Sequence, residues 1–450
     1  MFFQTKQRSI TQVNLNILEA IRHQVYGCFE RSADALMELT DALSSETAAR
    51  SLPELSLSPL FRRKWPSLYE ALEDGRINEQ RWSEVWSRTL LPEHTGPVWV
   101  SVDSTSIARP ESETSPDRGS IYVPNLPDAK RPVSVGWQVS TVMLLPTTRS
   151  SWGAILSQRR IKSEETAISV AIEQVEGLRD LLPAGTRLLA DRWYATGPFV
   201  AACQHLRLGA LLRLKRNRKL YRQAPPPVVG KRGAPRKDGD LFQGSRPETW
   251  GEPDAVWQGS DEQGRPITVQ AWQHLHFRQA RQVELSVYRV LREGAKGTRR
   301  DPRESWFIWV EQGPLPLEEV VGCYQRRFSH EHTYRFLKQD LLWTKIRVRT
   351  PEQFERWSLL VATAQNHLVL ARRLGQALYR PWERRREQVT PRQVRRVMAA
   401  ILPQVGTRAQ VPKPRGKSPG WPKGTPRRRS ARFAVIKKTK SAPKTPRKRT

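Results

Sequence analysis

Residues 98–103 read VWVSVD, with apolar side chains at positions 98, 100 and 102 and an aspartate at the end. This period of two predicts a half-buried β-strand. The pattern starts directly after Pro97, where a long region of helical periodicity stops. Alternating patterns continue at 135–145 and 151–161, so three consecutive strands are predicted from this point.

The elements that follow favour a mixed sheet. Residues 163–182 have a helical period, with Ser163 as the expected N-cap. A strand at 186–191, a helix at 198–206 and a strand at 209–215 come next. The predicted order is three strands, then a helix, a strand, a helix and a strand, which is the order of an RNase H-like α/β fold. Other mixed sheets also open with three meandering strands.

The rest of the chain divides by composition. Helix-period runs predict a helical N-terminal domain over residues 1–95, and residues 96–220 then form the first part of the core. A Pro-rich basic loop followed by alternating strands predicts a mostly β insertion at 221–312, and helical runs return at 313–403. Residues 404–450 are basic and Pro-punctuated without an apolar period, which predicts a disordered tail.

The charge of the chain favours a polyanionic partner. Its 450 residues include 76 Lys+Arg and 44 Asp+Glu, a formal net charge of +32. A nucleic acid backbone is the commonest partner for such an excess. The hydrophobic content of 38% and the 16 Trp indicate a folded protein and argue against a ribosomal one. No carboxylate follows Glu387, whereas residues 1–95 are slightly acidic.

The cysteines and the N-terminus bear on the cellular location. Cys28, Cys203 and Cys323 are far apart and form no CxxC pair, so a disulfide framework is not indicated. The first residues show no signal peptide, and no run approaches the length of a membrane span. We expect a soluble cytoplasmic protein, associated with the nucleoid and not with a membrane.

Two aspartates, Asp103 and Asp191, end predicted strands. Open α/β folds collect their active sites at the ends of sheet strands. A single aspartate there is explained as simply by its preference for turns. Two in one sheet favour a metal site, because divalent-metal chemistry on phosphodiesters needs several oxygen ligands at one point.

A third carboxylate comes from residues 324–338, YQRRFSHEHTYRFLK. On a helix with 100° per residue, Tyr324, Arg327, Glu331 and Lys338 fall within about 60° of one another. Glu331 would be a metal ligand, and the other three side chains would bind phosphate oxygens. The alternative is a solvated face with an ordinary i,i+4 ion pair. The two flanking histidines point to different sides of such a helix and do not indicate zinc.

The pattern Y-x2-R-x3-E-x6-K formed by these four residues, preceded by the two aspartates, resembles the YREK signature of a family of bacterial insertion-sequence transposases. The resemblance covers about residues 97–375. It implies an RNase H-like core interrupted by a mostly β insertion. It also implies that Asp103, Asp191 and Glu331 bind two Mg2+ ions, for which Mn2+ would substitute.

The resemblance implies further DNA contacts. Arg213 and Lys215 match a basic pair that contacts the DNA end, and Tyr194 matches the tyrosine three positions after the second aspartate. Trp306 aligns loosely with a tryptophan that packs against a flipped base, a role for which a flat aromatic is suited. A place in the core of a strand is the alternative for Trp306, and Trp309 is a rival for its role.

Two features depart from the family pattern. Trp193 stands where a small residue is more usual, and its bulk could narrow the site. The N-terminal region lacks the basic surplus expected of a domain that reads transposon ends. Its one cluster of basic residues, FRRKW at 61–65, could contact phosphate or form a solvated helix start.

The function implied is cut-and-paste DNA transposition by metal-dependent phosphodiester hydrolysis and strand transfer. The family excises DNA by a hairpin route. The expected partners are double-stranded DNA with terminal inverted repeats, target DNA and a second copy of the chain. An RNase H-fold nuclease without strand transfer, or a non-catalytic basic DNA-binding protein derived from a transposase, are the alternatives.

Overall fold

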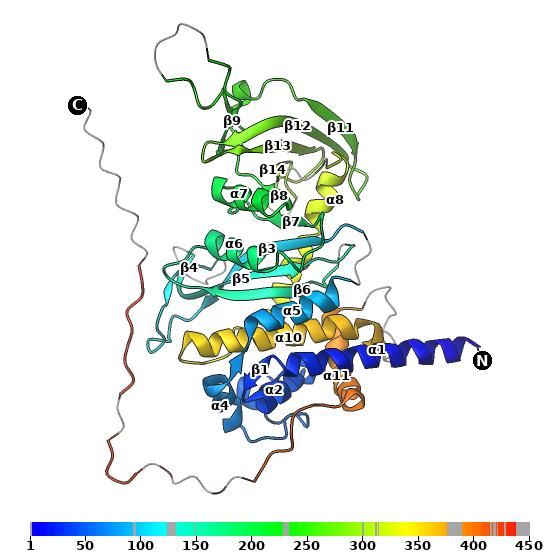
Figure 1. Cartoon of the computed structure of the whole chain (residues 1–450), viewed down its shortest axis with the longest axis vertical. Helices are drawn as coiled ribbons and strands as arrows, with labels where there is room; N and C mark the ends of the chain where they lie inside the picture. Colours follow the sequence, from blue (N-terminus) through cyan, green and yellow to red (C-terminus); the bar gives the residue numbers. More distant parts are fainter. Residues whose placement is uncertain are drawn as a thin grey trace.

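The computed structural model describes residues 2–92, 96–123, 132–148, 150–227, 234–298, 301–310, 313, 315–375, 389–414, 416, 420, 422–426 and 429–437, without the side chains of 2–11. The molecule is elongated. A β-rich region, a central sheet and a helical layer follow one another along its long axis (Figure 1).

The central sheet is mixed. It contains β3 (Trp99–Ala108), β5 (Val133–Leu144), β6 (Ala154–Ile161), β7 (Arg187–Ala190) and β8 (Gly209–Arg213), with α6 (Ala167–Gly177) leading from β6 to β7 and α7 (Gly197–His205) from β7 to β8. The spatial order is β6-β5-β3-β7-β8. β7 is parallel to both β3 and β8, and the other neighbours are antiparallel. This arrangement is compatible with the RNase H-like core expected from the sequence.

Strand β3 is longer than the sequence pattern predicts. It does not end at Asp103, because its pairing with β5 continues as far as Ala108. A short additional strand, β4 (Gly119–Tyr122), pairs with the beginning of β5. The predicted strand end at Asp103 is therefore wrong, and that residue lies inside a continuous strand.

Helix α6 also begins later than expected. Its N-cap is Thr166 and not Ser163. The Thr166 Oγ1 accepts from the backbone N–H of Ser169 at 3.0 Å, and the Ser169 Oγ accepts from the backbone N–H of Thr166 at 3.0 Å. This reciprocal capping box satisfies two backbone donors at the start of the helix.

The predicted β insertion continues the central sheet. Its elements are β9 (Lys219–Arg222), β10 (Leu241–Gln243), the 3-10 helix η1 (Pro247–Thr249), β11 (Ala255–Ser260), β12 (Pro266–Phe277), β13 (Ala280–Arg292) and β14 (Glu304–Val310). β14 pairs antiparallel with β8, so core and insertion form one twelve-stranded sheet. Residues 228–233 of the Pro-rich basic loop lie outside the described residues.

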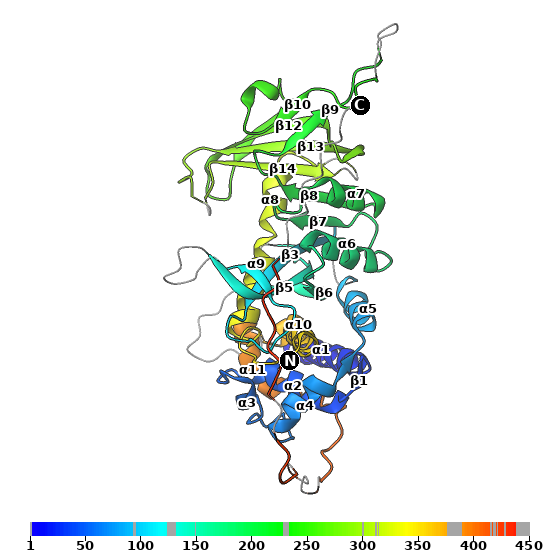
Figure 2. The same cartoon turned by 90° about the vertical axis from the view of Figure 1, so that its left-hand side faces the viewer.

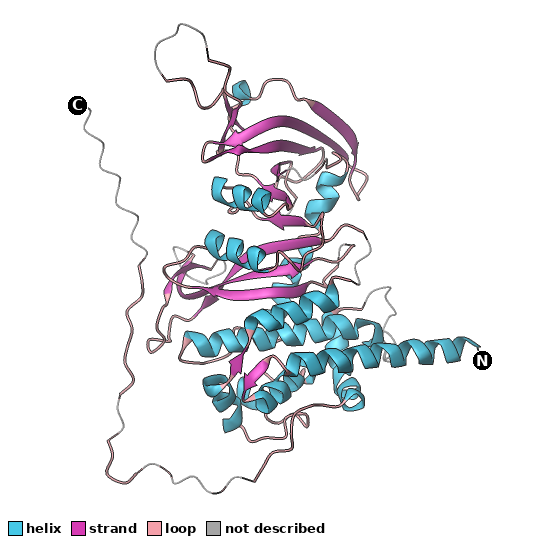
Figure 3. Ribbon diagram, in the orientation of Figure 1, coloured by secondary structure: helices cyan, strands magenta, loops and turns pink. Residues whose placement is uncertain are grey.

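Helices from both ends of the chain build the helical layer (Figure 3). They are α1 (Phe2–Tyr26), α2 (Ala33–Ser45), α3 (Leu52–Leu55), α4 (Pro66–Asp74), α5 (Glu79–Leu90), α10 (Pro351–Gly375) and α11 (Pro391–Val405), with a small sheet of β1 (Phe29–Arg31) and β2 (Arg76–Ile77). α10 packs against α1, α2, α11 and β6, and Trp82 donates from Nε1 to Thr363 Oγ1 at 2.8 Å. Helices α1, α2, α4 and α5 therefore share a core with the C-terminal helices. None of the described helices is long and apolar enough to cross a membrane.

The helix predicted at 315–340 is two helices, α8 (Glu319–Gln325) and α9 (Phe328–Gln339). Between them, the Arg327 N–H bonds to the Tyr324 carbonyl at 3.1 Å and the His330 N–H to the Arg327 carbonyl at 3.0 Å. These i→i−3 bonds are those of a 3-10 turn. Figure 2 shows α8 beside the insertion strands and α9 below it, beside β3.

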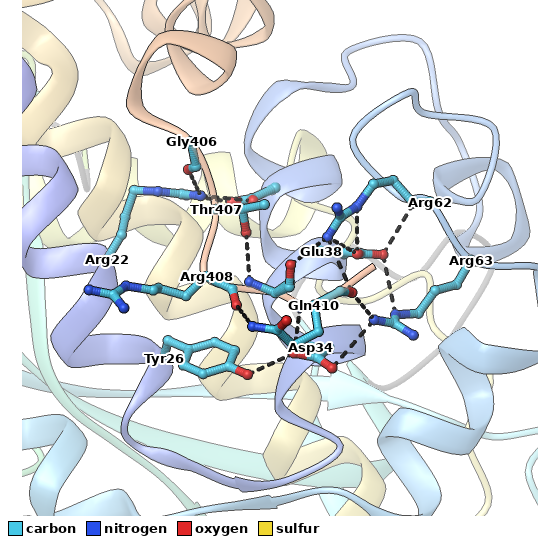
Figure 4. Close-up of polar contacts among 12 residues, drawn as sticks. Arg22, Tyr26, Asp34, Glu38, Arg62, Arg63, Gly406, Thr407, Arg408 and Gln410 are labelled. Atoms are coloured by element: carbon cyan, nitrogen blue, oxygen red, sulfur yellow. Dashed lines mark hydrogen bonds and ion pairs between the residues drawn. The ribbon is translucent and has the colours of Figure 1, made fainter. Parts of the chain in front are cut away.

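Part of the basic tail is fixed to the helical layer (Figure 4). Arg22 donates to the Gly406 carbonyl at 3.0 Å, Arg62 to the Ala409 carbonyl at 2.7 Å and Arg63 to the Gln410 carbonyl at 2.8 Å. Further along, Ile436 forms a β-bridge with Gly119. These described segments depart from the expected disorder because backbone carbonyls, which any sequence supplies, accept from arginines of the folded layer. Residues 438–450 lie outside the described residues.

A buried ion pair joins the first two helices, and breaking it should be costly. Arg22 donates to Asp41 Oδ2 at 2.9 Å, and the two side chains are 2% and 4% exposed. We expect Asp41→Asn to lower the free energy of unfolding by about 3–5 kcal/mol, because it leaves a buried guanidinium without its counter-charge. Urea unfolding followed by circular dichroism measures the difference.

The same substitution at Asp74 is the control. Asp74 pairs with Arg31 at 3.8 Å, and both side chains are more than half exposed. Asp74→Asn should change the free energy of unfolding by less than about 1 kcal/mol. Equal effects at the two positions would show that the buried pair contributes no more than a surface pair.

Candidate active site

The parallel pairing of β3 with β7 places the two aspartates side by side. Val102 is in register with Ala190, the last residue of β7, so Asp103 and Asp191 come next on neighbouring strands. Neighbouring strands lie about 4.8 Å apart. The chain leaves the sheet after Ala190, whereas β3 continues. The two carboxylates therefore sit where β7 stops covering one edge of β3.

Helix α9 carries Glu331 and is held against β3 by polar contacts. The Tyr334 hydroxyl donates to the Asp103 carbonyl at 2.9 Å. Lys338 Nζ donates to Thr105 Oγ1 at 2.6 Å. A hydrogen bond of 2.6 Å also joins Ser101 Oγ to Nδ1 of the buried His330. These bonds fix the helix that carries Glu331 along the strand that carries Asp103.

Arg327 links two of the three carboxylates. One terminal nitrogen donates to Glu331 Oε1 at 2.6 Å, and the other donates to Asp103 Oδ2. The Arg327 side chain is 10% exposed. Burial opposes its charge, but Asp103, Tyr324, Glu331 and Asp191 together outweigh burial and raise the pKa of Arg327. All three carboxylates therefore act on one guanidinium.

The same charges shift Asp103. Burial raises the pKa of Asp103, Arg327 opposes this, and the carboxylates of Asp191 and Glu331 raise it further. Mutual repulsion of this kind is expected where several carboxylates share one site. A divalent cation would relieve it.

The donor chemistry fits hard divalent metals, because carboxylate oxygens are the ligands that Mg2+ and Mn2+ prefer. Within the described part of the chain, no group of three or more His, Cys, Asp or Glu side chains is arranged to hold a metal as it stands. Arg327 pairs with one oxygen of Asp103 and one oxygen of Glu331, which are groups that a metal would need. Metal binding requires these ion pairs to be exchanged for metal contacts.

Tyr324 does not share a helix with Glu331, because the chain turns between α8 and α9. Its ring packs against Phe307 of β14, with the centroids 4.8 Å apart. Burial raises the pKa of Tyr324 to about 12. The predicted stripe is thus split: Tyr324 faces the insertion, while Arg327, Glu331 and Lys338 lie along β3.

The predicted basic pair lies at the end of β8. Arg213 is the last residue of that strand and is in register with Phe307. Lys215 Nζ lies 3.2 Å from the ring centroid of Trp193, two residues after Asp191. Arg213 therefore ends the strand next to β7, and Lys215 follows two residues later, against the ring of Trp193 in the turn after Asp191.

Tyr194 and Trp306, both expected to contact DNA, are each 2% exposed. Tyr194 packs against Phe199 with the ring centroids 5.2 Å apart. Trp306 stacks on Trp272 at 5.9 Å. Each would reach DNA only if the core around it opened. Trp309, the rival for the role of Trp306, is buried as well.

Sequence reasoning missed several residues that shape the site. The contacts of Tyr334 and His330 with β3 carry no local signal, because their partners are more than 200 positions away. The Arg327–Glu331 pair was visible as an i,i+4 spacing. The second contact of Arg327, with Asp103, could not be predicted from spacing, because Asp103 is 224 positions away.

Comparison with known families gives one match. The model described as DDE superfamily endonuclease matches residues 24–278, more than half of the chain. The matched region contains Asp103, Asp191 and helices α2 to α5, and it ends before Glu331. A search of curated proteins finds no match.

Lys338 should make stability depend on pH. Burial lowers its pKa to about 8, although Asp103 acts in the opposite direction. The unfolded chain keeps that proton up to about pH 10.4, so between these values it binds more protons than the folded chain and stability rises with pH. We expect Lys338→Met to lose this rise, so that its stability relative to the parent falls as the pH is raised from 7 to 10.

Urea unfolding of both proteins at pH 7, 8, 9 and 10 measures the effect. Lys345→Met is the control, because Lys345 is exposed. Its difference from the parent should stay constant over the same range. A constant difference for Lys338→Met would contradict the lowered pKa.

Proposed function

The chain belongs to the DDE endonuclease superfamily, and on that premise we propose that it is a DNA transposase of the YREK-signature group. The observation that carries the proposal is that Asp103 and Glu331 both pair with Arg327, while Asp191 follows the strand next to that of Asp103. These residues come from β3, the end of β7 and α9, which are far apart in sequence. A purely structural ion pair needs one carboxylate, whereas phosphodiester chemistry with metals needs several.

Asp103, Asp191 and Glu331 would hold two Mg2+ ions, or Mn2+ in their place. Bound there, the metals would activate the attacking water or 3′-hydroxyl and stabilise the leaving oxygen of an in-line displacement. The Tyr334 and Lys338 hydrogen bonds would keep α9, and with it Glu331, in place. Arg327 would hold the carboxylates before metal binds, and once released it could contact a phosphate oxygen as a bidentate donor.

The proposed substrate is double-stranded DNA with terminal inverted repeats, cut at its ends and joined to target DNA. Arg213, Lys215 and Lys338 supply positive charge around the carboxylates, and Tyr324 would approach the DNA from α8. The net charge of +32 favours binding to the phosphate backbone. Synapsis of two ends implies a homodimer, excision would use a DNA hairpin, and the protein would act at the bacterial nucleoid.

A second candidate is a nuclease that cleaves without strand transfer. The description of the matched family, endonuclease, names cleavage alone and favours this candidate. It would use the same carboxylates. Joining of a 3′-hydroxyl end to a target plasmid distinguishes the two, because a nuclease gives no joined product.

Removing a carboxylate should abolish cleavage. We expect Asp103→Asn and Glu331→Gln each to reduce cleavage by at least about 100-fold, because even indirect partners of metal ligands are worth about 10- to 100-fold. The assay is the conversion of supercoiled plasmid carrying the element's ends to nicked and linear forms in Mg2+.

Glu352→Gln is the matched control. Glu352 is an exposed glutamate in the first turn of α10, away from these carboxylates. The Glu352→Gln variant should cleave the plasmid at the rate of the parent protein. Cleavage at the parental rate by either carboxylate variant would remove that residue from the proposed site.

A further inference from the structure

Trp193 is an exposed aromatic beside the carboxylates. A turn closed by the Tyr194 N–H and the Asp191 carbonyl, 3.0 Å apart, follows β7. This turn sends the Tyr194 ring into the core and leaves Trp193 61% exposed. Exposing an indole forgoes the burial that stabilises most tryptophans of a folded chain.

One face of the Trp193 ring is occupied by a cation. Lys215 Nζ lies 3.2 Å from the ring centroid, well within the range of a cation–π interaction. This contact positions the indole without covering its other face. The ring is therefore held between a lysine on one side and solvent on the other.

The ion pairs of the cations near Trp193 bear on what this surface could bind. Among the described residues, no ion pair involves Arg192, Lys215 or Arg218, whereas the neighbouring Arg216 is paired with Glu304 at 3.3 Å. Burial lowers the pKa of Lys215, and the charges of Arg218 and Arg192 lower it further, while the charge of Asp191 opposes them. Three cations near a single carboxylate leave an excess of positive charge, which favours an anionic ligand.

We propose that Trp193 stacks on an unpaired nucleobase of the DNA strand that passes over Asp191, while Lys215 and Arg218 bind the adjoining phosphates. The proposal rests on the proposed function, since it places the stacked base next to the carboxylates. An aromatic platform flanked by cations is how proteins bind single-stranded nucleic acid. Trp193 takes the role expected of Trp306, whose ring is buried.

Binding of DNA without divalent metal tests the proposal, because no cleavage intervenes. The full chain is titrated into a fluorescent single-stranded oligonucleotide and into a blunt duplex, with EDTA present. We expect Trp193→Ala to weaken binding of the single strand about tenfold, within the usual range for loss of one stacked base. Trp193→Phe should retain most of the affinity, and the duplex should be affected less.

A second readout responds to stacking itself. An oligonucleotide containing 2-aminopurine should lose fluorescence when the parent binds it, and Trp193→Ala should abolish this quenching at saturating protein. Lys215→Gln and Arg218→Gln should each reduce the salt dependence of log K by about 0.7, the value of one phosphate contact on a single strand.

Trp65→Ala is the control, because Trp65 is 59% exposed in the helical layer. If Trp65→Ala weakens binding as much as Trp193→Ala, or if Trp193→Ala binds and quenches like the parent, the stacking proposal is overturned. Absence of any DNA binding by the parent would overturn the proposed function as well. Normal stacking without plasmid cleavage would overturn the proposed function and leave the stacking site standing.

Discussion

The parallel pairing of β3 with β7 is the constraint on which the site depends. Val100, Val102, Leu188 and Ala190 are fully buried, and their packing fixes the register of the two strands. Register fixed by apolar residues also fixes the polar residues that follow. Two carboxylates are thereby held together although they repel each other, and the guanidinium of Arg327 offsets part of that repulsion.

The positive charge of the chain is of two kinds. In the helical layer, Arg62 and Arg63 pair with the buried Glu38 and bind carbonyls of the tail, so they stabilise the fold. Both arginines of the FRRKW stretch therefore have partners within the protein. Beside Asp191, Lys215 and Arg218 have no carboxylate partner among the described residues. Net charge alone indicates a polyanionic partner, but only the distribution of ion pairs indicates where on the surface that partner would bind.

Sequence patterns predicted the central sheet well and the side-chain contacts poorly. The succession of strands and helices along the chain followed from alternation and helical periodicity, because these are local properties. The break at Arg327 has no glycine or proline to mark it. The burial of Tyr194 and Trp306 depends on a turn and on an aromatic cluster assembled from distant strands. The contacts of residues 406–410 with the helical layer were missed because they use backbone carbonyls, which composition does not reveal.

The tail contacts also determine when the fold can be completed. Arg22 in α1 binds the carbonyl of Gly406, 384 positions later, and Trp82 bonds to Thr363 in α10. At about 5–20 residues per second, a ribosome needs about 20 to 80 s to make the intervening chain. The strands of the central sheet emerge earlier than α10. During synthesis, the apolar faces of α1, α2 and α5 therefore stay uncovered until α10 and α11 have been made. These early helices complete their packing after the strands of the central sheet have emerged.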